Sequence, residues 1–347
     1  MRPKLKPLKE QVMVITGASS GIGLTIARRA ASEGATVVLC ARNEAALREV
    51  RDAIRAGGGQ AEFVVGDVGE REDMRRLAET TVERFGRIDT WVNDAGIGVY
   101  AKLEEISDED HQRLFQTNYW GVVYGSTEAL KHLKRNGGAL INIGSIASEM
   151  PTPLLSAYAA SKHAVKGFTD SLRMELLQEK APVSVTLIKP ASIDTPFTAH
   201  AKSYMDEGAQ VPPPVYSPEL VADAVLHAAQ RPVRMITVGG AGRMMTASAH
   251  MAPGLTDRLL TSAFFLLARR GSRRGQPVNL HHAGRDGRRY GDAKLVRRTS
   301  LYTAAQTHPR IAAGVGFAVG IAAAAVAAGA LSRRGPRGAL RRLRQAA

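Results

Sequence analysis

Residues 12–23, Val-Met-Val-Ile-Thr-Gly-Ala-Ser-Ser-Gly-Ile-Gly, decide the fold of this chain. An apolar run at 12–15 predicts a buried strand, and the glycines after it make a turn that opens directly into an amphipathic stretch. Glycines let a backbone approach a ligand closely, and the helix N-terminus behind them offers free N–H groups and a partial positive charge. This order of strand, turn and helix predicts a site for the pyrophosphate of a dinucleotide.

The same alternation of short apolar runs and longer amphipathic stretches continues to residue 238. It is typical of βαβ units, and the near-continuous apolar runs indicate strands that are covered on both faces. We therefore expect an α/β fold, a Rossmann-type doubly wound parallel seven-stranded sheet. The predicted strands are 12–16, 36–41, 62–65, 90–92, 139–143, 183–188 and 235–238, and the predicted helices are 22–33, 43–56, 73–85, 108–133, 157–179 and 218–229.

The chain divides into four predicted parts. Residues 1–239 form the catalytic domain, in which the proline-rich segment 191–217 is too long for an ordinary loop and predicts a lid. Residues 240–310 hold an amphipathic helix at 255–268 and an Arg/Gly-rich linker to about Ser300, in a largely helical or irregular C-terminal extension. A helix at 311–331 and a basic tail at 332–347 follow.

The formal net charge of +15 belongs to the C-terminal part of the chain. From Arg269 onward there are 17 Lys and Arg residues and two acidic residues, whereas the first 268 residues carry equal numbers of basic and acidic side chains. Basic residues also flank the uncharged 21-residue run 311–331, which is long enough to span a bilayer but only modestly apolar. We expect membrane association through this run, with a helix packed on protein or a disordered segment as alternatives; nucleic-acid binding by the tail has no supporting motif.

A single cysteine, Cys40, excludes an intramolecular disulfide and fits a reducing compartment. Because no apolar region with a cleavage site follows the basic N-terminus, we expect no secretion signal and a cytoplasmic location, with anchoring at a membrane by 311–331 left open. His281 and His282 have no Cys or acid at ligand spacing, so we expect no metal site.

Two further patterns point to chemistry. Arg42 lies at the end of the second predicted strand. An NAD-selective site would place an acidic residue at this position to bind the ribose hydroxyls. A cation at this position instead favours the 2′-phosphate of NADP(H), although NAD(H) stays possible. Tyr158 and Lys162 lie four residues apart on one predicted helix face. An ammonium group beside a phenol lowers its pKa, which makes the tyrosine usable as a general acid and base.

Taken together, these residues resemble the short-chain dehydrogenase/reductase family in its compact single-domain form, over roughly residues 10–238. Thr16 to Gly23 resembles the TGxxxGIG turn, Asp67-Val68 the adenine-binding pair, and Asn93 to Gly96 the NNAG motif. Asn118, Ser145 and the pair Tyr158 and Lys162 resemble the family's catalytic residues. The chain departs from the family pattern at Asp94, which replaces the second Asn of NNAG and cannot donate as an ionised carboxylate, and at Ala191, which replaces a Gly.

The resemblance implies that Tyr158 exchanges a proton with the substrate oxygen, that Ser145 positions that oxygen, and that Lys162 lowers the pKa of Tyr158 and binds the nicotinamide ribose. Asn118 would hold a water that links Lys162 to solvent. The implied cofactor-binding residues are Gly17, Ser19, Ser20, Gly21, Ile22, Gly23, Arg42, Asp67, Val68, Asn93, Ala95, Gly96, Tyr158, Lys162, Pro190, Ile193 and Thr195. The family also implies a homo-oligomer, a dimer or tetramer, formed through the helices that contain Asn118 and Tyr158.

The expected substrate is an apolar carbonyl compound or alcohol. Ser145, Met150, Leu155 and Tyr158 are the predicted substrate-binding residues, and the lid and its neighbouring loops supply further candidate wall residues: Tyr100, Pro151, Leu154, Phe197, Tyr204 and Met205. Glu149 is either a polar contact or a solvated loop acid. We therefore predict an NADP(H)-dependent oxidoreductase that interconverts a carbonyl and a secondary alcohol, and the alternative is a non-catalytic NADP(H)-binding scaffold or sensor at a membrane.

Overall fold

The structure is a computed structural model, and it describes residues 3–205, 209–268, 278–284 and 287–308. The chain forms two compact units, residues 1–303 and 304–347. Of the second unit the structure describes only residues 304–308, the last turn of helix α11 (Leu301–Thr307), where the backbone N–H of His308 donates to the carbonyl of Ala304 at 2.8 Å.

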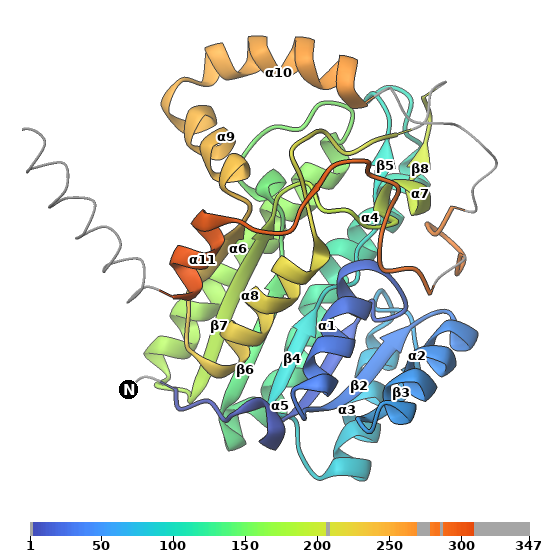
Figure 1. The fold of residues 1–347 in the computed structure, drawn as a ribbon, viewed down its shortest axis with the longest axis vertical. Coiled ribbons are helices and arrows are strands. Elements are labelled where there is room, and N and C mark those ends of the chain that lie inside the picture. The colour runs from blue at the N-terminus through green and yellow to red at the C-terminus, as the bar shows by residue number, and fades with distance from the viewer. Residues whose placement is uncertain (1–2, 206–208, 269–277, 285–286, 309–347) are drawn as a thin grey trace, which may run out of the picture. The chain divides into compact units, whose positions relative to one another are not determined.

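A parallel sheet of seven strands forms the centre of the first unit, as the sequence predicts (Figure 1). Its spatial order is β10-β7-β6-β4-β1-β2-β3. The strands are β1 (Val12–Thr16), β2 (Thr36–Ala41), β3 (Gln60–Val65), β4 (Thr90–Asn93), β6 (Gly138–Ile143), β7 (Val183–Pro190) and β10 (Met235–Val238). Two small parallel pairs lie outside this sheet: β5 (Val99–Tyr100) with β8 (Lys202–Ser203), and β9 (Val215–Tyr216) with β11 (Val296–Arg297).

Helices cover both faces of the sheet. Helices α1 (Gly21–Ser32), α2 (Glu44–Ala56) and α8 (Pro218–Gln230) pack on one face, and α3 (Arg71–Phe85), α5 (Gly121–Asn136) and α6 (Ser156–Gln178) pack on the other. The remaining described helices are α4 (Asp108–Phe115), α7 (Phe197–His200), α9 (Gly240–Met251) and α10 (Pro253–Ala268), with short helical turns η1 (Leu8–Glu10), η2 (Gln116–Trp120) and η3 (Ile146–Ser148).

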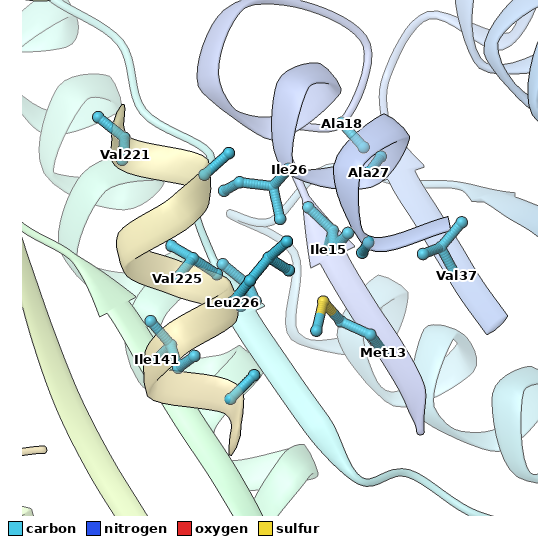
Figure 2. Packing of buried hydrophobic residues seen from close by; sticks show 14 of the residues in the cluster. Met13, Ile15, Ala18, Ile26, Ala27, Val37, Ile141, Val221, Val225 and Leu226 are labelled. Atoms are coloured by element: carbon cyan, nitrogen blue, oxygen red, sulfur yellow. The ribbon is translucent and has the colours of Figure 1, made fainter. Parts of the chain in front are cut away.

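Strand β1 supplies side chains to both halves of the core. Met13 and Ile15 belong to the cluster under α1 and α8, and Val12 and Val14 belong to the cluster on the opposite face. This alternation follows from the two-residue period of a strand. Figure 2 shows Ile15 directed toward side chains of α1 and α8.

The predicted single helix 108–133 is wrong in one respect, because it is interrupted by the π-helical turn η2. The interruption shifts the helix register next to Asn118, and such turns occur frequently at functional sites.

The interpretation of the Arg/Gly-rich stretch as a linker also needs correction. Its described residues bond to the catalytic domain, for example through the backbone N–H of Gly287, which donates to the carbonyl of Ser19 at 2.8 Å.

Among the described residues, no helix is both long enough and apolar enough to cross a bilayer. The predicted segment 311–331 and the predicted tail 332–347 lie outside the described residues.

We expect the substitution Ile15→Ala to lower the free energy of unfolding by about 3 kcal/mol, because Ile15 is fully buried and its truncation leaves a cavity between β1 and its covering helices. Urea denaturation measures this change. Leu103→Ala is the control, since Leu103 is 66% exposed and its truncation is expected to change stability by less than about 0.5 kcal/mol. Equal stability of the two variants would contradict this packing.

Candidate active site

A cavity of about 300 Å³ lies at the carboxyl ends of the parallel strands. The chain enters the sheet at β1, runs outward to β3 and then returns to β4 on the other side of β1, so the loops after β1 and β4 separate and leave a crevice. The sequence-predicted site residues that line this cavity are Gly17, Ser19, Ser20, Gly21, Ile22, Arg42, Asp67, Val68, Ala95, Gly96, Ser145, Met150, Leu155, Tyr158, Lys162, Pro190, Ile193 and Thr195.

Three predicted site residues stand behind the cavity wall. A Cβ at Gly23 would lie 2.4 Å from the carbonyl oxygen of Gly17, so only glycine lets the turn pack this closely on α1. Asn93 is 3% exposed, and its amide donates to the side chain of Asn142 at 2.9 Å. Its contacts therefore join β4 to β6.

Asn118 is the third of these residues, and it is fully buried in η2. Its Oδ1 accepts from the Ile97 N–H at 2.9 Å, and its Nδ2 donates to the Ile97 carbonyl at 3.0 Å and to the hydroxyl of Ser161 at 3.1 Å. These contacts engage both amide hydrogens of Asn118. The side chain therefore fixes the loop after β4 against α6, and its implied contact with a relay water stays a prediction.

The side chains of Ser145, Tyr158 and Lys162 meet in the cavity. Tyr158 and Lys162 project from one face of α6, and the Lys162 Nζ lies 5.7 Å from the centre of the Tyr158 ring. That Nζ donates to the Ile143 carbonyl at the end of β6 at 2.9 Å. The hydroxyl of Ser145 is hydrogen-bonded to Tyr158 and accepts from the Ala147 N–H at 3.1 Å.

Burial shifts the pKa values of this group. It raises the pKa of Tyr158 to about 12, against the lowering effect of the hydrogen bond with Ser145. It also lowers the pKa of Lys162 to about 8, against the raising effect of the Asp94 charge. The lowering of the Tyr158 pKa that the sequence predicts from Lys162 does not appear, because only the hydrogen bond with Ser145 opposes burial, and at neutral pH the tyrosine is a protonated phenol.

Asp94 lies beneath the glycine-rich turn. Burial raises its pKa to about 7, although the Lys162 charge and a hydrogen bond from the Gly23 N–H both lower it. A carboxyl group that is protonated near neutrality can donate a hydrogen bond, as the asparagine expected at this position would. The backbone N–H of Asp94 donates to the Thr16 hydroxyl at 3.1 Å, which ties the loop after β4 to the end of β1.

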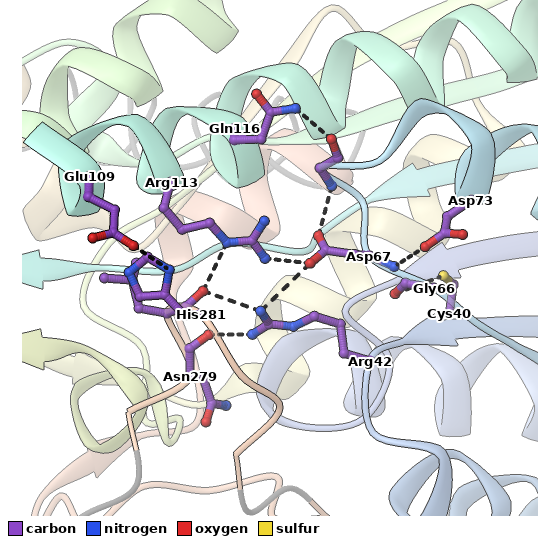
Figure 3. A network of polar contacts seen from close by, with 12 residues as sticks. Cys40, Arg42, Gly66, Asp67, Asp73, Glu109, Arg113, Gln116, Asn279 and His281 are labelled. Atoms are coloured by element: carbon purple, nitrogen blue, oxygen red, sulfur yellow. Dashed lines mark hydrogen bonds and ion pairs between the residues drawn. The ribbon is translucent and has the colours of Figure 1, made fainter.

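Arg42 lies at the adenosine end of the cavity, by which we mean the end lined by Arg42 and Asp67. Its guanidinium donates to the backbone carbonyls of Asn279 and Leu280 and lies 3.8 Å from the carboxylate of Asp67, as Figure 3 shows. Asp67 is also paired with Arg113. Backbone carbonyls far along the chain therefore hold the guanidinium of Arg42 at this end of the cavity, and its contact with a 2′-phosphate stays a prediction.

The chemistry of this cavity fits a phosphorylated dinucleotide. The N-terminus of α1, Arg42 and Lys162 all line it and offer positive or partly positive groups for phosphates and hydroxyls. Two lining residues, Thr117 and Asn279, each also carry a buried side-chain oxygen that has no hydrogen-bond partner among the described residues.

Sequence reasoning missed both of these residues. Thr117 directly precedes Asn118, so its position in the same motif was a usable signal. Asn279 had none, because it lies in a polar stretch without periodicity, and only the tertiary fold brings it to the cavity.

The substrate side of the cavity is mainly apolar. Tyr100, Met150, Leu155 and Phe197 line it, whereas Pro151, Leu154, Tyr204 and Met205 do not. The Tyr204 hydroxyl donates to Asp110 at 2.5 Å, and Leu154 and Met205 are buried in a neighbouring cluster. Glu149 is neither a substrate contact nor a solvated acid, since it forms an ion pair with the buried Lys189 at 2.6 Å.

The chain is similar to curated oxidoreductases. It is 45% identical over 318 residues to the uncharacterized oxidoreductase YxnA of Bacillus subtilis, a match that covers 90% of this chain and 89% of the relative. It is also 36% identical over 275 residues to a fatty acyl-CoA reductase of Acinetobacter baylyi, covering 77% of this chain and 90% of the relative.

Two solved structures resemble the fold. One is an alcohol dehydrogenase from the archaeon Thermococcus sibiricus in complex with 5-hydroxy-NADP, with a TM-score of 0.58 and 28% identity, covering 65% of this chain and 95% of that one. The other is actinorhodin polyketide ketoreductase with NADPH, with a TM-score of 0.53 and 35% identity, covering 55% and 74%.

We expect Asp94→Asn to increase stability at pH 8 by up to about 4 kcal/mol and to leave it nearly unchanged at pH 4. The raised pKa of Asp94 means that folding favours its protonated form, so the wild type loses stability as the pH rises from about 4, its ordinary range, through about 7. The asparagine has no such loss. Thermal unfolding of both proteins between pH 4 and pH 8 measures the difference, and parallel pH profiles would contradict the assignment.

A family model described as short chain dehydrogenase matches residues 11–206, which is more than half of the chain. The match spans the glycine-rich turn, the loop after β4, Ser145 and the Tyr158–Lys162 pair, whose side chains the fold brings to one cavity. With its seven-stranded sheet, and with the relatives described above, the chain belongs to the short-chain dehydrogenase/reductase family.

Proposed function

We propose that this protein is an NADP(H)-dependent oxidoreductase that interconverts a carbonyl group and a secondary alcohol, with Tyr158 as the general acid and base. The observation that carries the proposal is the meeting of Ser145, Tyr158 and Lys162 in the cavity that also holds the glycine-rich turn. A site that only bound the dinucleotide would need the turn but not this set of proton-transfer groups.

Each side chain has a defined task in reduction. Tyr158 donates its phenolic proton to the carbonyl oxygen, and the Ser145 hydroxyl, oriented by the Ala147 N–H, donates a hydrogen bond to the same oxygen. Lys162, fixed by the Ile143 carbonyl, presents its charge to the phenol and to a ribose hydroxyl. Bound NADPH supplies the hydride for the carbonyl carbon. The raised pKa of Tyr158 keeps the phenol protonated near neutral pH, which is the form that donates the proton in reduction.

We propose an apolar carbonyl compound as the substrate. Met150, Leu155 and Phe197 offer hydrocarbon surface beside Tyr158, whose ring lies 5.4 Å from that of Phe197. Among the relatives are a fatty acyl-CoA reductase and an 11-beta-hydroxysteroid dehydrogenase of Sesamum indicum, 40% identical over 190 residues that cover 54% of each chain. Both names are consistent with an apolar ligand.

We expect Tyr158→Phe to lower kcat for NADPH-dependent ketone reduction by at least about 1000-fold, because the substrate oxygen loses its proton donor. NADPH affinity is expected to stay within about twofold, since the phenyl ring keeps its packing. Steady-state kinetics on a panel of apolar ketones and aldehydes and titration calorimetry measure the two quantities. Tyr119→Phe, at a half-buried tyrosine outside the cavity, is the control. Turnover at the wild-type rate in the Tyr158→Phe variant would contradict the catalytic assignment. Tight NADPH binding by the wild type without turnover of any tested compound would favour the scaffold alternative.

The preference for NADP(H) over NAD(H) is proposed from Arg42. We expect Arg42→Ala to weaken NADPH binding by about 10- to 100-fold and to change NADH binding by about twofold or less, because only NADPH carries the 2′-phosphate. Calorimetric titration with both cofactors measures the ratio. Arg48→Ala is the matched control, since Arg48 lies on α2 and pairs with Glu44 outside the cavity. An equal effect on both cofactors would contradict selection by Arg42.

The assembly and the location of the protein are proposals as well. Exposed apolar side chains lie on η2 and α6, at Trp120, Met174 and Leu177. They support the implied dimer or tetramer through the helices that contain Asn118 and Tyr158, since patches of this kind mark association surfaces. A cytoplasmic location, and anchoring by residues 311–331, stay predictions from the sequence.

A further inference from the structure

The turn that carries Ser145 is attached to β7 at both of its ends. Ser145 is the N-cap of η3, and Glu149 is its C-cap. At the first end, the Gly144 N–H donates to the Ile188 carbonyl at 2.8 Å. At the second end, the carboxylate of Glu149 lies 2.6 Å from the Nζ of Lys189. Two adjacent residues of one strand therefore hold the two ends of this turn.

Hydrogen bonds inside η3 link its two ends. The Ser145 hydroxyl accepts from the Ala147 N–H at 3.1 Å, and the Ser145 N–H donates to the Ser148 hydroxyl at 3.2 Å. The Glu149 N–H donates to the Ile146 carbonyl at 3.0 Å. Because so few residues separate the two ends, a displacement of Glu149 is passed on to the Ser145 hydroxyl.

The ion pair at the second end is buried. The side chains of Glu149 and Lys189 are 12% and 3% exposed. Burial lowers the pKa of Lys189, against the raising effect of the hydrogen bond and the charge of Glu149. The charges of Arg243 and Lys166 lower it further. A buried cation requires an opposite charge beside it, so the pairing also fixes where the Glu149 carboxylate lies.

The pair lies behind the wall of the cavity. Neither Glu149 nor Lys189 lines the cavity, but the residue that follows each of them does: Met150 and Pro190. Ser145, at the other end of the turn, lines it as well. The pair therefore joins two parts of the cavity wall without contact to the space that a ligand would fill.

The two partners differ in how firmly the backbone holds them. Lys189 lies in β7, which pairs with β6 on one side and with β10 on the other. Glu149 follows a single helical turn outside the sheet. When the ion pair is lost, we therefore expect the turn to move and the strand to stay.

We propose that Glu149 and Lys189 are positioning residues for the reaction: their buried ion pair holds the second end of η3 on β7 and thereby keeps the Ser145 hydroxyl aimed at the substrate oxygen. Neither side chain touches the substrate. This inference rests on the proposed function, because it takes Ser145 to bind the oxygen of a carbonyl substrate.

The first test is a double-mutant cycle between Glu149 and Ser145 in the full-length protein, measured as the rate of NADPH-dependent ketone reduction in single turnovers. We expect Glu149→Ala to slow reduction by about 10-fold, since it misplaces the hydroxyl, and Ser145→Ala to slow it by about 100-fold, since it removes that donor. NADPH affinity should stay within about twofold in each variant, because the turn moves and the strand with Pro190 does not.

The combined variant distinguishes positioning from general damage. If Glu149 acts through Ser145, Glu149→Ala has no further effect once the hydroxyl is absent, and the double variant matches Ser145→Ala within about twofold. A double variant slowed by about 1000-fold, the product of the two single effects, would overturn the proposal.

An exposed ion pair supplies the matched control. Glu179 lies 2.6 Å from Lys134, and the two side chains are 46% and 42% exposed. Exposed pairs of this kind contribute little to stability, so Glu179→Ala should reduce the ketone at the wild-type rate.

Two further variants guard against a folding defect. Lys189→Met combined with Glu149→Leu removes both charges, so no buried charge stays unpaired and the protein should fold as stably as the wild type. Reduction should still be slowed by about 10-fold, because an apolar contact is not directional. Glu149→Gln keeps an oxygen that accepts from Lys189 and should stay within about threefold of the wild type. Reduction at the wild-type rate by the apolar pair would overturn the role of the ion pair.

Hydrogen exchange provides a readout that needs no substrate. The N–H groups of Ala147 and Ser148 donate to the hydroxyl and the carbonyl of Ser145. We expect them to exchange at least about 10-fold faster in Glu149→Ala and at the wild-type rate in Glu179→Ala. Unchanged exchange in Glu149→Ala would overturn the proposal. Faster exchange together with a wild type that reduces no tested compound would instead count against the proposed function.

Discussion

The position of β1 between β2 and β4 is the constraint on which the rest of the structure depends. Both pairings are parallel, so the carboxyl ends of all three strands lie at the same edge of the sheet. The connections leave this edge in opposite directions, and the crevice between them receives Gly17 from β1, Arg42 from β2 and Gly96 from β4. Core packing on both faces of β1 thus determines where the site lies.

Burial has a second effect, on the charges within that crevice. Removal from water opposes ionisation of Asp94, Tyr158 and Lys162 alike. The attraction between Asp94 and Lys162 compensates only in part, and the Asp94 charge adds to the effect of burial on Tyr158. Since the Asp94 charge favours the charged form of Lys162 and disfavours that of Tyr158, the acid that distinguishes this chain from the family pattern is coupled to both residues. The protonation states of these three groups therefore form one electrostatic system.

The sequence predicted those features that depend on local pattern. The strands of the sheet appear as apolar runs, and the glycine-rich turn and the Tyr158–Lys162 pair are short motifs whose context identifies them. It failed where neighbours in space are distant in the chain. The π-helical turn at Asn118 has no periodic signature that differs from an α-helix, and the Tyr204 hydroxyl is bonded to Asp110 and to the Ser107 N–H outside the cavity. Residues 278–284 have the composition of a linker, yet Arg42 binds two of their backbone carbonyls and Leu280 is buried.

Synthesis order also separates in time two parts of the cavity that the finished fold presents together. Arg42 and the Asn279 carbonyl that it binds are 237 residues apart, and the last strand of the sheet, β10, ends at Val238. At translation speeds of about 5–20 residues per second, several seconds pass between the synthesis of β10 and that of residues 287–293. The whole sheet, Arg42 and Tyr158 are therefore synthesised before the backbone that binds the Arg42 guanidinium, so this end of the cavity can be completed only afterwards.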